Sequence, residues 1–196
     1  MSRWFWYFMI YSFLGCCLEK LFAQAIHSPH QVRKCLLALP LCPVYGLAMT
    51  ALLALAGPER NPLALVLLGG GVCTAVEYAV HWAYDRLLGV KFWDYGGLKW
   101  NLGGRVCLGF SLVWGALSAL AVRWLQPWIA LAAAAVPPPV TFGFWLLLAA
   151  DGVCSAALLG RYHDPDLLAW RAAGALRYGS SASSARPDTH TGSGPR

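Results

Sequence analysis

The chain has 196 residues, of which 58% are hydrophobic and only 12% are charged, and its formal net charge is +6 at pH 7. An ordinary soluble domain carries about 25% charged residues, and a soluble fold of this length has too little interior to hide so much apolar surface. The composition therefore excludes an ordinary soluble domain. The positive charge indicates membrane topology rather than nucleic-acid binding.

Five hydrophobic runs follow one another along the chain, each long enough to cross about 30 Å of hydrocarbon as a helix. They cover residues 4–22, 39–56, 63–84, 106–125 and 140–160. They predict an all-α, polytopic membrane helix bundle of about five transmembrane helices. A turn around Pro127 should end the fourth run, and the short apolar stretch 129–136 is interpreted as an interfacial segment, with a sixth short span as the alternative.

The first run has an acidic residue late in its length. Ser12, Gly15 and Glu19 follow at steps of three and four, which places them on one helical face. Small residues on such a face let another helix approach closely. Glu19 is either a functional carboxylate or an interfacial charge beside Lys20 that reaches toward water. No small-residue cleavage site follows the run, so it is expected to be a retained first helix rather than a signal peptide.

The second run begins with two prolines, Pro40 and Pro43, followed by Tyr45 and Gly46. Proline lacks a backbone N–H and disturbs the interior of a helix. The sequence therefore predicts an irregular, non-helical start to this run.

The third run combines a polar stripe with a glycine triplet. Thr74, Glu77, His81 and Asp85 continue on one face, which would suit a proton or a cation. The alternative is that Glu77 is structural and pairs with a group such as Arg105. Residues 69–71 are three glycines, which favour close helix packing over a bend.

The segment between the third and fourth runs, residues 85–105, is the most polar and aromatic part of the chain. Trp and Tyr beside Lys and Arg are typical of a membrane interface. Two interpretations stay open, a polar headgroup site or a salt-bridged loop that locks the bundle. The candidate residues are Trp93, Asp94, Tyr95, Asn101 and Arg105.

Charges assign the two sides of the membrane. With five spans and without the tail, one side receives six Lys and Arg residues and the other receives three. The richer side, which includes the 85–105 segment, should be cytoplasmic, so the N-terminus is expected outside and the C-terminus inside. A sixth span would move the tail outside.

One transmembrane domain is expected over residues 1–160, in which Asp151 of the fifth run is interpreted as a packing or cap residue. A short amphipathic surface helix is expected at 161–178. Residues 179–196, rich in Ser, Pro, Gly, Thr and Arg, are expected to form a disordered tail.

Familiar catalytic patterns do not occur in the chain. It has no HExxH, no GxSxG and no phosphate loop of the form GxxxxGK[ST]. The seven cysteines form no CxxC pair and most lie in the hydrophobic runs, where they serve as small apolar residues. No intrinsic catalytic activity, cofactor or metal is therefore expected.

Three blocks of residues carry a resemblance to a known family. Residues 11–19 (YSFLGCCLE) are similar to Y-S-F-x-G-W-x-x-E, and residues 40–46 (PLCPVYG) are similar to G-P-x-x-P-I-Y-G. The third block resembles E-Y, R-W-W-D-Y, N-x-x-G-R-I-C-L and S-x-x-W-G, and it comprises Glu77-Tyr78, residues 91–95 (KFWDY), residues 101–108 (NLGGRVCL), Ser111 and Trp114-Gly115. Across residues 8–127, the chain thus resembles the bacterial ABC-transporter type IV permease-like membrane proteins. It departs from the pattern at Cys16, Leu39, Lys91 and Phe92.

The resemblance implies a permease subunit in the cell membrane that works with a separate ATPase subunit. Because five helices are few for a full pathway, such a permease would assemble, for example as a homo-oligomer surrounded by membrane lipids. The alternative from another class is a membrane-embedded enzyme or lipid-binding protein that uses the cytoplasmic-side cluster around Asp94 and Arg105. A scaffold in which every polar residue is structural is the third hypothesis.

Overall fold

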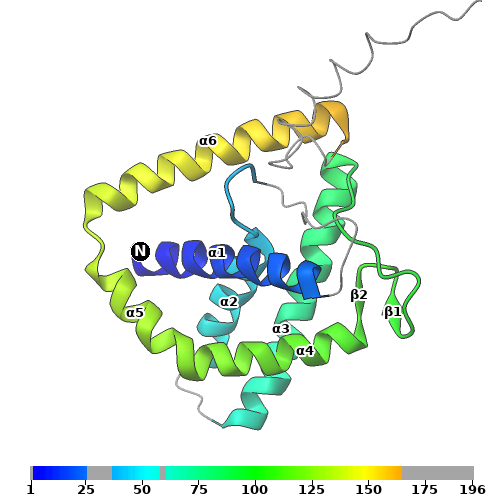
Figure 1. Cartoon of the computed structure of the whole chain (residues 1–196), viewed down its shortest axis with the longest axis horizontal. Coiled ribbons are helices and arrows are strands. Elements are labelled where there is room, and N and C mark those ends of the chain that lie inside the picture. The colour runs from blue at the N-terminus through cyan, green and yellow to red at the C-terminus, as the bar shows by residue number, and fades with distance from the viewer. Residues whose placement is uncertain (1, 26–36, 58–60, 165–196) are drawn as a thin grey trace, which may run out of the picture.

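A computed structural model of the chain describes residues 2–25, 37–57 and 61–164. The described part is almost entirely helical (Figure 1) and confirms the predicted all-α membrane bundle. Two π-helical turns extend helices, and two short strands pair in antiparallel register before α4. The elements in chain order are α1 (Ser2–Ala25), α2 (Pro43–Ala56), α3 (Pro62–Ala83), η1 (Tyr84–Leu88), β1 (Asn101–Leu102), β2 (Val106–Cys107), α4 (Leu108–Leu120), η2 (Ala121–Leu125), α5 (Gln126–Ala135) and α6 (Pro138–Tyr162).

Four helical rods in the described residues are long and apolar enough to cross a membrane, namely Ser2–Ala25, Pro62–Leu88, Leu108–Ala135 and Pro138–Tyr162. The second expected span is shorter than predicted. Helix α2 has 14 residues, so it is about 21 Å long at 1.5 Å per residue, because the residues before Pro43 do not join it. The number of spans and their orientation stay predictions.

The expected break at Pro127 is wrong. Leu108–Ala135 is one apolar rod of 28 residues, in which the π-helical turn η2 joins α4 to α5. Pro127 lies in the first turn of α5, directly after the wide turn. A π-helical turn changes the local hydrogen-bond register, so that the helix can continue although Pro127 has no backbone N–H to donate. The rod therefore curves here instead of ending. The stretch 129–136 is therefore mostly the end of this rod and not a separate interfacial segment.

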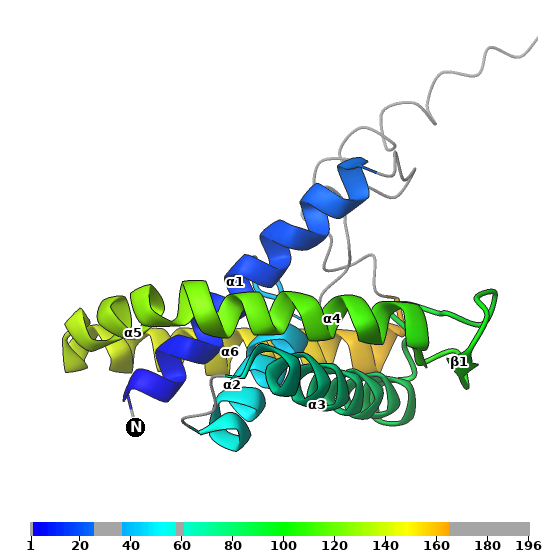
Figure 2. The ribbon, with the colours of Figure 1, turned by 90° about the horizontal axis from the view of Figure 1, so that it is seen from below.

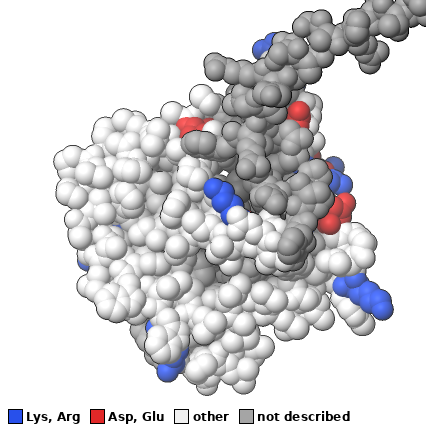
Figure 3. All heavy atoms as spheres, viewed as in Figure 1, with Lys and Arg blue, Asp and Glu red and all other residues white. Residues whose placement is uncertain are grey.

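The rods frame a core around α1 and α2. Figures 1 and 2 show α3, the α4–α5 rod and α6 around α2, with α1 crossing at a steep angle. Tyr11, Met49, Leu52 and Leu65 form the main buried cluster, which joins α1, α2 and α3. Many large apolar side chains on the outer faces of the helices are exposed. Figure 3 shows mainly uncharged surface over the helices, as lipid contact requires.

Glycines bring α3 and α4 into close contact. A Cβ on Gly115 would lie 2.5 Å from the Val66 backbone oxygen, and one on Gly69 would overlap the Ser118 hydroxyl. Only hydrogen fits at these positions, which confirms the packing role predicted for the triplet. Gly71 differs from its neighbours because its missing Cβ would face open space.

The irregular start predicted for the second run is confirmed. Residues 37–42 are not helical, and the Cys42 N–H donates to the Ser12 backbone oxygen over 2.9 Å. The carboxylate of Asp151, from α6, accepts the N–H groups of Ala38 and Leu39, each over 3.1 Å. Asp151 thus caps this segment, in agreement with its predicted role. Apart from residues 161–164, the expected surface helix and the tail lie outside the described residues.

Candidate functional site

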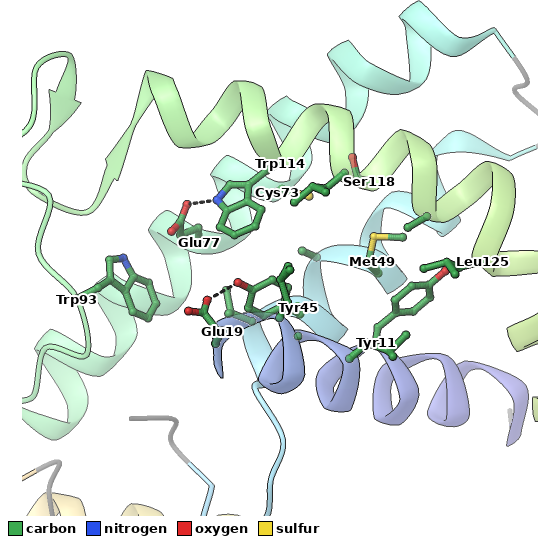
Figure 4. A pocket seen from close by; sticks show the side chains of 17 residues that line it. Tyr11, Glu19, Tyr45, Met49, Cys73, Glu77, Trp93, Trp114, Ser118 and Leu125 are labelled. Carbon is green, nitrogen blue, oxygen red and sulfur yellow. Dashed lines mark hydrogen bonds between the residues drawn. The ribbon is translucent and has the colours of Figure 1, made fainter. Parts of the chain in front are cut away.

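A cavity of about 280 Å³ lies between α1, α2, α3 and the α4–η2 part of the long rod. Most of its wall is apolar, but both predicted intramembrane carboxylates, Glu19 and Glu77, line it (Figure 4). They come from α1 and α3, helices that are separated by α2 in the sequence. The two residues that the sequence placed in different spans therefore share one site.

Glu19 is only 4% exposed, so it is not an interfacial charge that reaches into water. The hydroxyl of Tyr45, from α2, donates to Glu19 Oε1. Gly15, one turn earlier on α1, makes room for the Tyr45 ring, because a Cβ at this glycine would overlap the ring. The face formed by Ser12, Gly15 and Glu19 thus packs against α2, as its small residues predict.

Glu77 is 5% exposed and both of its oxygens accept hydrogen bonds. The Tyr95 hydroxyl donates to Oε1 over 2.9 Å, and the Trp114 indole N–H donates to Oε2 over 3.2 Å. The suggested pairing with Arg105 is wrong, because that guanidinium binds elsewhere. Both donors are neutral groups whose rings also supply apolar wall, the mixed character that suits Tyr and Trp at such a site.

The aromatic residues Tyr45 and Trp114 connect the two carboxylates. Their rings meet edge to face at a centroid distance of 5.4 Å, so a contact path runs from Glu19 through both rings to Glu77. Figure 4 shows Glu19, Glu77 and Trp93 toward one end of the cavity and Met49 and Leu125 toward the other. The cavity therefore has one end with both carboxylates and one end without them, where Tyr11 lies beside Met49 and Leu125.

His81 continues the α3 stripe but does not line the cavity. It is 3% exposed, its Nε2–H donates to the Trp93 carbonyl over 3.0 Å, and its ring meets the Trp93 ring edge to face. Its Nδ1 has no hydrogen-bond partner among the described residues. The contact holds Trp93 against the cavity. Of the predicted stripe, Glu77 thus lines the cavity, whereas His81 supports a residue of the cavity wall and does not line it.

The loop between α3 and α4 uses two predicted site residues to shape its own backbone. Asp94 Oδ1 accepts the Gly96 N–H over 2.7 Å. The Asn101 side chain accepts the Gly104 N–H over 2.9 Å and donates to the Leu98 carbonyl over 2.7 Å. These are turn-forming contacts of the kind expected from Asp and Asn. They favour the structural interpretation of Asp94 and Asn101 over a headgroup site.

Arg105 ties the loop to the end of α3. Its guanidinium pairs with Asp85 over 3.1 Å, donates to the Tyr78 hydroxyl over 3.1 Å and lies 5.3 Å from the centre of the Tyr78 ring. The hydrogen bond that the guanidinium donates to the Asp85 carboxylate is the main reason why the pKa of Arg105 is raised above its ordinary value. Its backbone carbonyl accepts the Trp93 indole N–H over 3.0 Å. Arg105 thus orients Trp93 through its main chain.

Sequence reasoning missed Tyr45 and Trp114 as site residues, although both lie in the blocks that carry the family resemblance. The available signal was an aromatic residue with a polar atom inside an apolar run, since a buried Tyr or Trp usually needs a hydrogen-bond partner. That signal does not identify the partner. Only the packing of α2 and α4 beside α1 and α3 brings these rings to the two carboxylates.

Comparison with known proteins gives one family. A family model described as Putative ABC-transporter type IV matches residues 6–155, which is most of the chain and reaches beyond the 8–127 region of the sequence resemblance into α6. No curated protein and no solved structure matches the chain.

Proposed function

The chain belongs to this ABC-transporter type IV family of membrane proteins, and on that basis we propose that it is the permease subunit of an ABC-type transporter. The chain contains no phosphate loop, so ATP hydrolysis would come from a separate subunit. Solute would bind in the cavity that Glu19 and Glu77 line.

One observation supports this function most, the meeting of two buried carboxylates in one cavity between apolar helices. A carboxylate inside a membrane is costly, and such residues typically mark solute or ion pathways. A scaffold needs neither a cavity nor two acidic residues on its wall. The permease function gives both features a purpose.

The charge count predicts which side of the membrane the 85–105 loop faces. The 85–105 loop is expected on the cytoplasmic side, where an ATPase subunit would dock. Because the described residues supply four helices long enough to cross a membrane and one short helix, we propose that the complete transporter in the cell membrane contains more than one copy of this chain.

The test begins with the partner. Tagged full-length chain, extracted from its native membrane in mild detergent, should retain a protein with a phosphate loop, detected by mass spectrometry, and should hydrolyse ATP after reconstitution into lipid vesicles. A stable, homogeneous preparation without any ATPase, obtained in both detergent and nanodiscs, would contradict the permease function.

Glu77→Gln separates a functional carboxylate from a structural one. A glutamine carbonyl can accept the Trp114 N–H while its amide donates to the Tyr95 hydroxyl oxygen, since a hydroxyl both donates and accepts. The variant should therefore melt within a few degrees of the wild type and retain the ATPase partner. Its ATP hydrolysis in vesicles should be lost if the charge is needed for transport, whereas unchanged hydrolysis would favour the scaffold hypothesis.

A further inference from the structure

We infer that the cavity takes up one hydrocarbon chain of a membrane lipid, which enters sideways from the bilayer through an opening between α1 and the α4–η2 part of the long rod. The inference rests on the proposed permease function only where it identifies this lipid with the transported solute. It then names the chemical class of that solute, a molecule with a hydrocarbon chain, which neither the family nor the sequence motifs indicate.

Four leucines mark the side opening of the cavity. Each of them lines the cavity and is between 37% and 47% exposed, and they are Leu14 and Leu18 of α1 and Leu117 and Leu125 of the long rod. Among the described elements, α1 packs chiefly on α2 and α5, whereas α4 packs chiefly on α3. The cavity therefore reaches the surface between α1 and α4, where its wall is incomplete.

Two contacts between α1 and the long rod bound this opening. Toward one end, the Tyr11 hydroxyl donates to the side-chain oxygen of Gln126 over 2.9 Å. Toward the other end, the rings of Phe22 and Phe110 meet edge to face at a centroid distance of 6.4 Å. The α1 segment from Tyr11 to Phe22 is about 16 Å long at 1.5 Å per residue. Because a hydrocarbon chain needs only about 4 Å to the atoms on either side of it, it can pass between the two contacts.

The opening lies at the depth of the hydrocarbon core. Both α1 and the long rod are long and apolar enough to cross a membrane. Leu14 lies near the middle of Ser2–Ala25, and Leu117 and Leu125 lie on either side of the middle of Leu108–Ala135. The molecules outside the opening at this depth are lipid chains, because water and headgroups stay at the two interfaces. The position of the opening thus argues for a hydrocarbon occupant.

The end of the cavity without the carboxylates suits such a chain. Met49 and Leu125 lie there beside Tyr11 (Figure 4), whose hydroxyl is already hydrogen-bonded. The hydroxyl of Ser118, also on the wall, donates to the Gly115 backbone oxygen over 3.0 Å. An empty apolar space loses the dispersion contacts of its wall, and water does not fill it without polar partners. The volume of about 280 Å³ lies at the lower end of ligand pockets, so part of one chain enters and the headgroup stays outside.

Photolabelling of the full-length chain in phosphatidylcholine nanodiscs tests this inference. The probe is phosphatidylcholine with a diazirine at the end of one acyl chain, and a control probe carries the diazirine on its headgroup. The chain probe should label Met49, which is 6% exposed and belongs to the buried core cluster. Leu55, which lies on the same helix and is 67% exposed, reports lipid on the outer surface. Residue-resolved mass spectrometry distinguishes the two positions.

Two results would overturn the inference at this stage. Labelling of Leu55 without Met49 by the chain probe would show that lipid stays outside the cavity. Equal labelling of Met49 by the headgroup probe would show that the cavity opens to the interface, so that the chain does not enter sideways.

Larger side chains on the rod should close the route. Ala121→Phe fills the cavity from η2, and Leu117→Trp narrows the side opening, where the 37% exposure of Leu117 leaves room for a larger ring. Each variant should abolish labelling of Met49 by the chain probe while labelling of Leu55 persists. Wild-type labelling of Met49 in both folded variants would also overturn the inference.

The matched controls make the same changes on the outer face of α4. Ala116→Phe and Leu112→Trp replace exposed residues that do not line the cavity, and both should leave Met49 labelled as in the wild type. Loss of the Met49 label in these controls as well would show that added bulk anywhere on α4 prevents labelling, and sideways entry between the four leucines would be wrong.

The lipid chain and the permease function fail separately. Absence of the Met49 label in a preparation that retains its ATPase would overturn the lipid chain alone. A Met49 label that Ala121→Phe removes, in a chain without an ATPase partner, would support the lipid chain and contradict the permease function.

Discussion

Glu77 and Asp85 belong to the same stripe of α3 and its π-helical extension, yet they meet opposite surroundings. Glu77 lines the cavity and accepts hydrogen bonds from the neutral donors Tyr95 and Trp114. Asp85, two steps of four residues later, pairs with the Arg105 guanidinium at the loop. The loop thus supplies its own cation for Asp85, whereas the hydrogen bonds described for Glu77 come from neutral donors. The comparison distinguishes a cavity wall that can bind solute, at Glu77, from a salt bridge that holds the loop to the end of α3, at Asp85.

Because of this difference, we expect substitutions at the cavity and substitutions in the loop to have different effects. Changes at the cavity should alter both stability and ligand binding, because its carboxylates accept internal hydrogen bonds and also face the cavity. Changes at the loop should alter stability alone, because the described contacts of Asp94, Asn101 and Arg105 join parts of the protein to one another.

The largest effect is expected from Glu77→Leu. Leucine keeps the bulk but removes both acceptors, so that the Tyr95 hydroxyl and the Trp114 N–H each lose the acceptor described for them in the interior. A buried donor without a partner costs about 1–3 kcal/mol, so the free energy of unfolding should fall by roughly 2–4 kcal/mol. Denaturant titration in mixed micelles measures this loss.

The matched control for this substitution is Glu77→Gln, which should lose less than about 1 kcal/mol because both hydrogen bonds can be remade. Equal losses for the leucine and glutamine variants would show that the charge of Glu77, and not its acceptor atoms, stabilises the bundle. The comparison with Asp85 would then fail, since both carboxylates would act as structural ions.

The sequence predicts the helices and the buried acids better than it predicts their partners. Hydropathy and length place the spans, and the cost of a charge in lipid singles out Glu19 and Glu77. The partners are decided by tertiary packing, since Trp114 reaches Glu77 from a helix 37 positions later in the chain. Helical spacing within α3 contains no information about that helix, so the sequence suggested Arg105 as a partner and did not single out Trp114.

Pro127 shows a second limit of sequence analysis. Proline usually ends or bends a helix, and a break at this residue divided the fourth run from the stretch that follows. The structure keeps one rod because the turn at 121–125 widens before the proline is reached. Nothing in the composition of Ala121–Leu125 distinguishes a π-helical turn from an ordinary α-helical one, so the continuity of this rod could not be predicted.

A smaller effect is expected from Gly104→Ala in the loop. Gly104 has a φ of +71°, which costs an alanine about 1–2 kcal/mol, and a Cβ there would lie 2.5 Å from Asp94 Oδ1. The Asp94 side chain would have to move and weaken its bond to the Gly96 N–H. The unfolding free energy should therefore fall by about 2 kcal/mol, with ATP hydrolysis in lipid vesicles unchanged.

Gly103→Ala is the control for this loop substitution. Gly103 has a similar φ of +60°, but a Cβ there meets nothing within 4 Å. Its loss should be only the backbone cost of about 1 kcal/mol. If the two alanine variants lost the same stability, the Asp94 contact would contribute nothing to the loop, and the structural interpretation of Asp94 would be wrong.

The smallest effect is expected from Arg105→Ala. The Arg105 and Asp85 side chains are 20% and 28% exposed, so water and salt screen their attraction. The stability loss should be less than that of Gly104→Ala and should shrink as salt concentration rises. Because the pKa of Arg105 is raised from an already high ordinary value, the guanidinium stays charged in both folded and unfolded chains, and its contribution should be constant between about pH 7 and 10.

A double-mutant cycle with Asp85→Asn isolates the pair, because each single variant removes one partner of the same contact. ATP hydrolysis in lipid vesicles should remain at the wild-type rate in all three variants, since neither residue lines the cavity. A loss of ATP hydrolysis in Arg105→Ala as large as that of Glu77→Gln would show that the loop charge and the cavity charge act as one network. The distinction between a cavity that binds solute and a loop that only stabilises the fold would then be wrong.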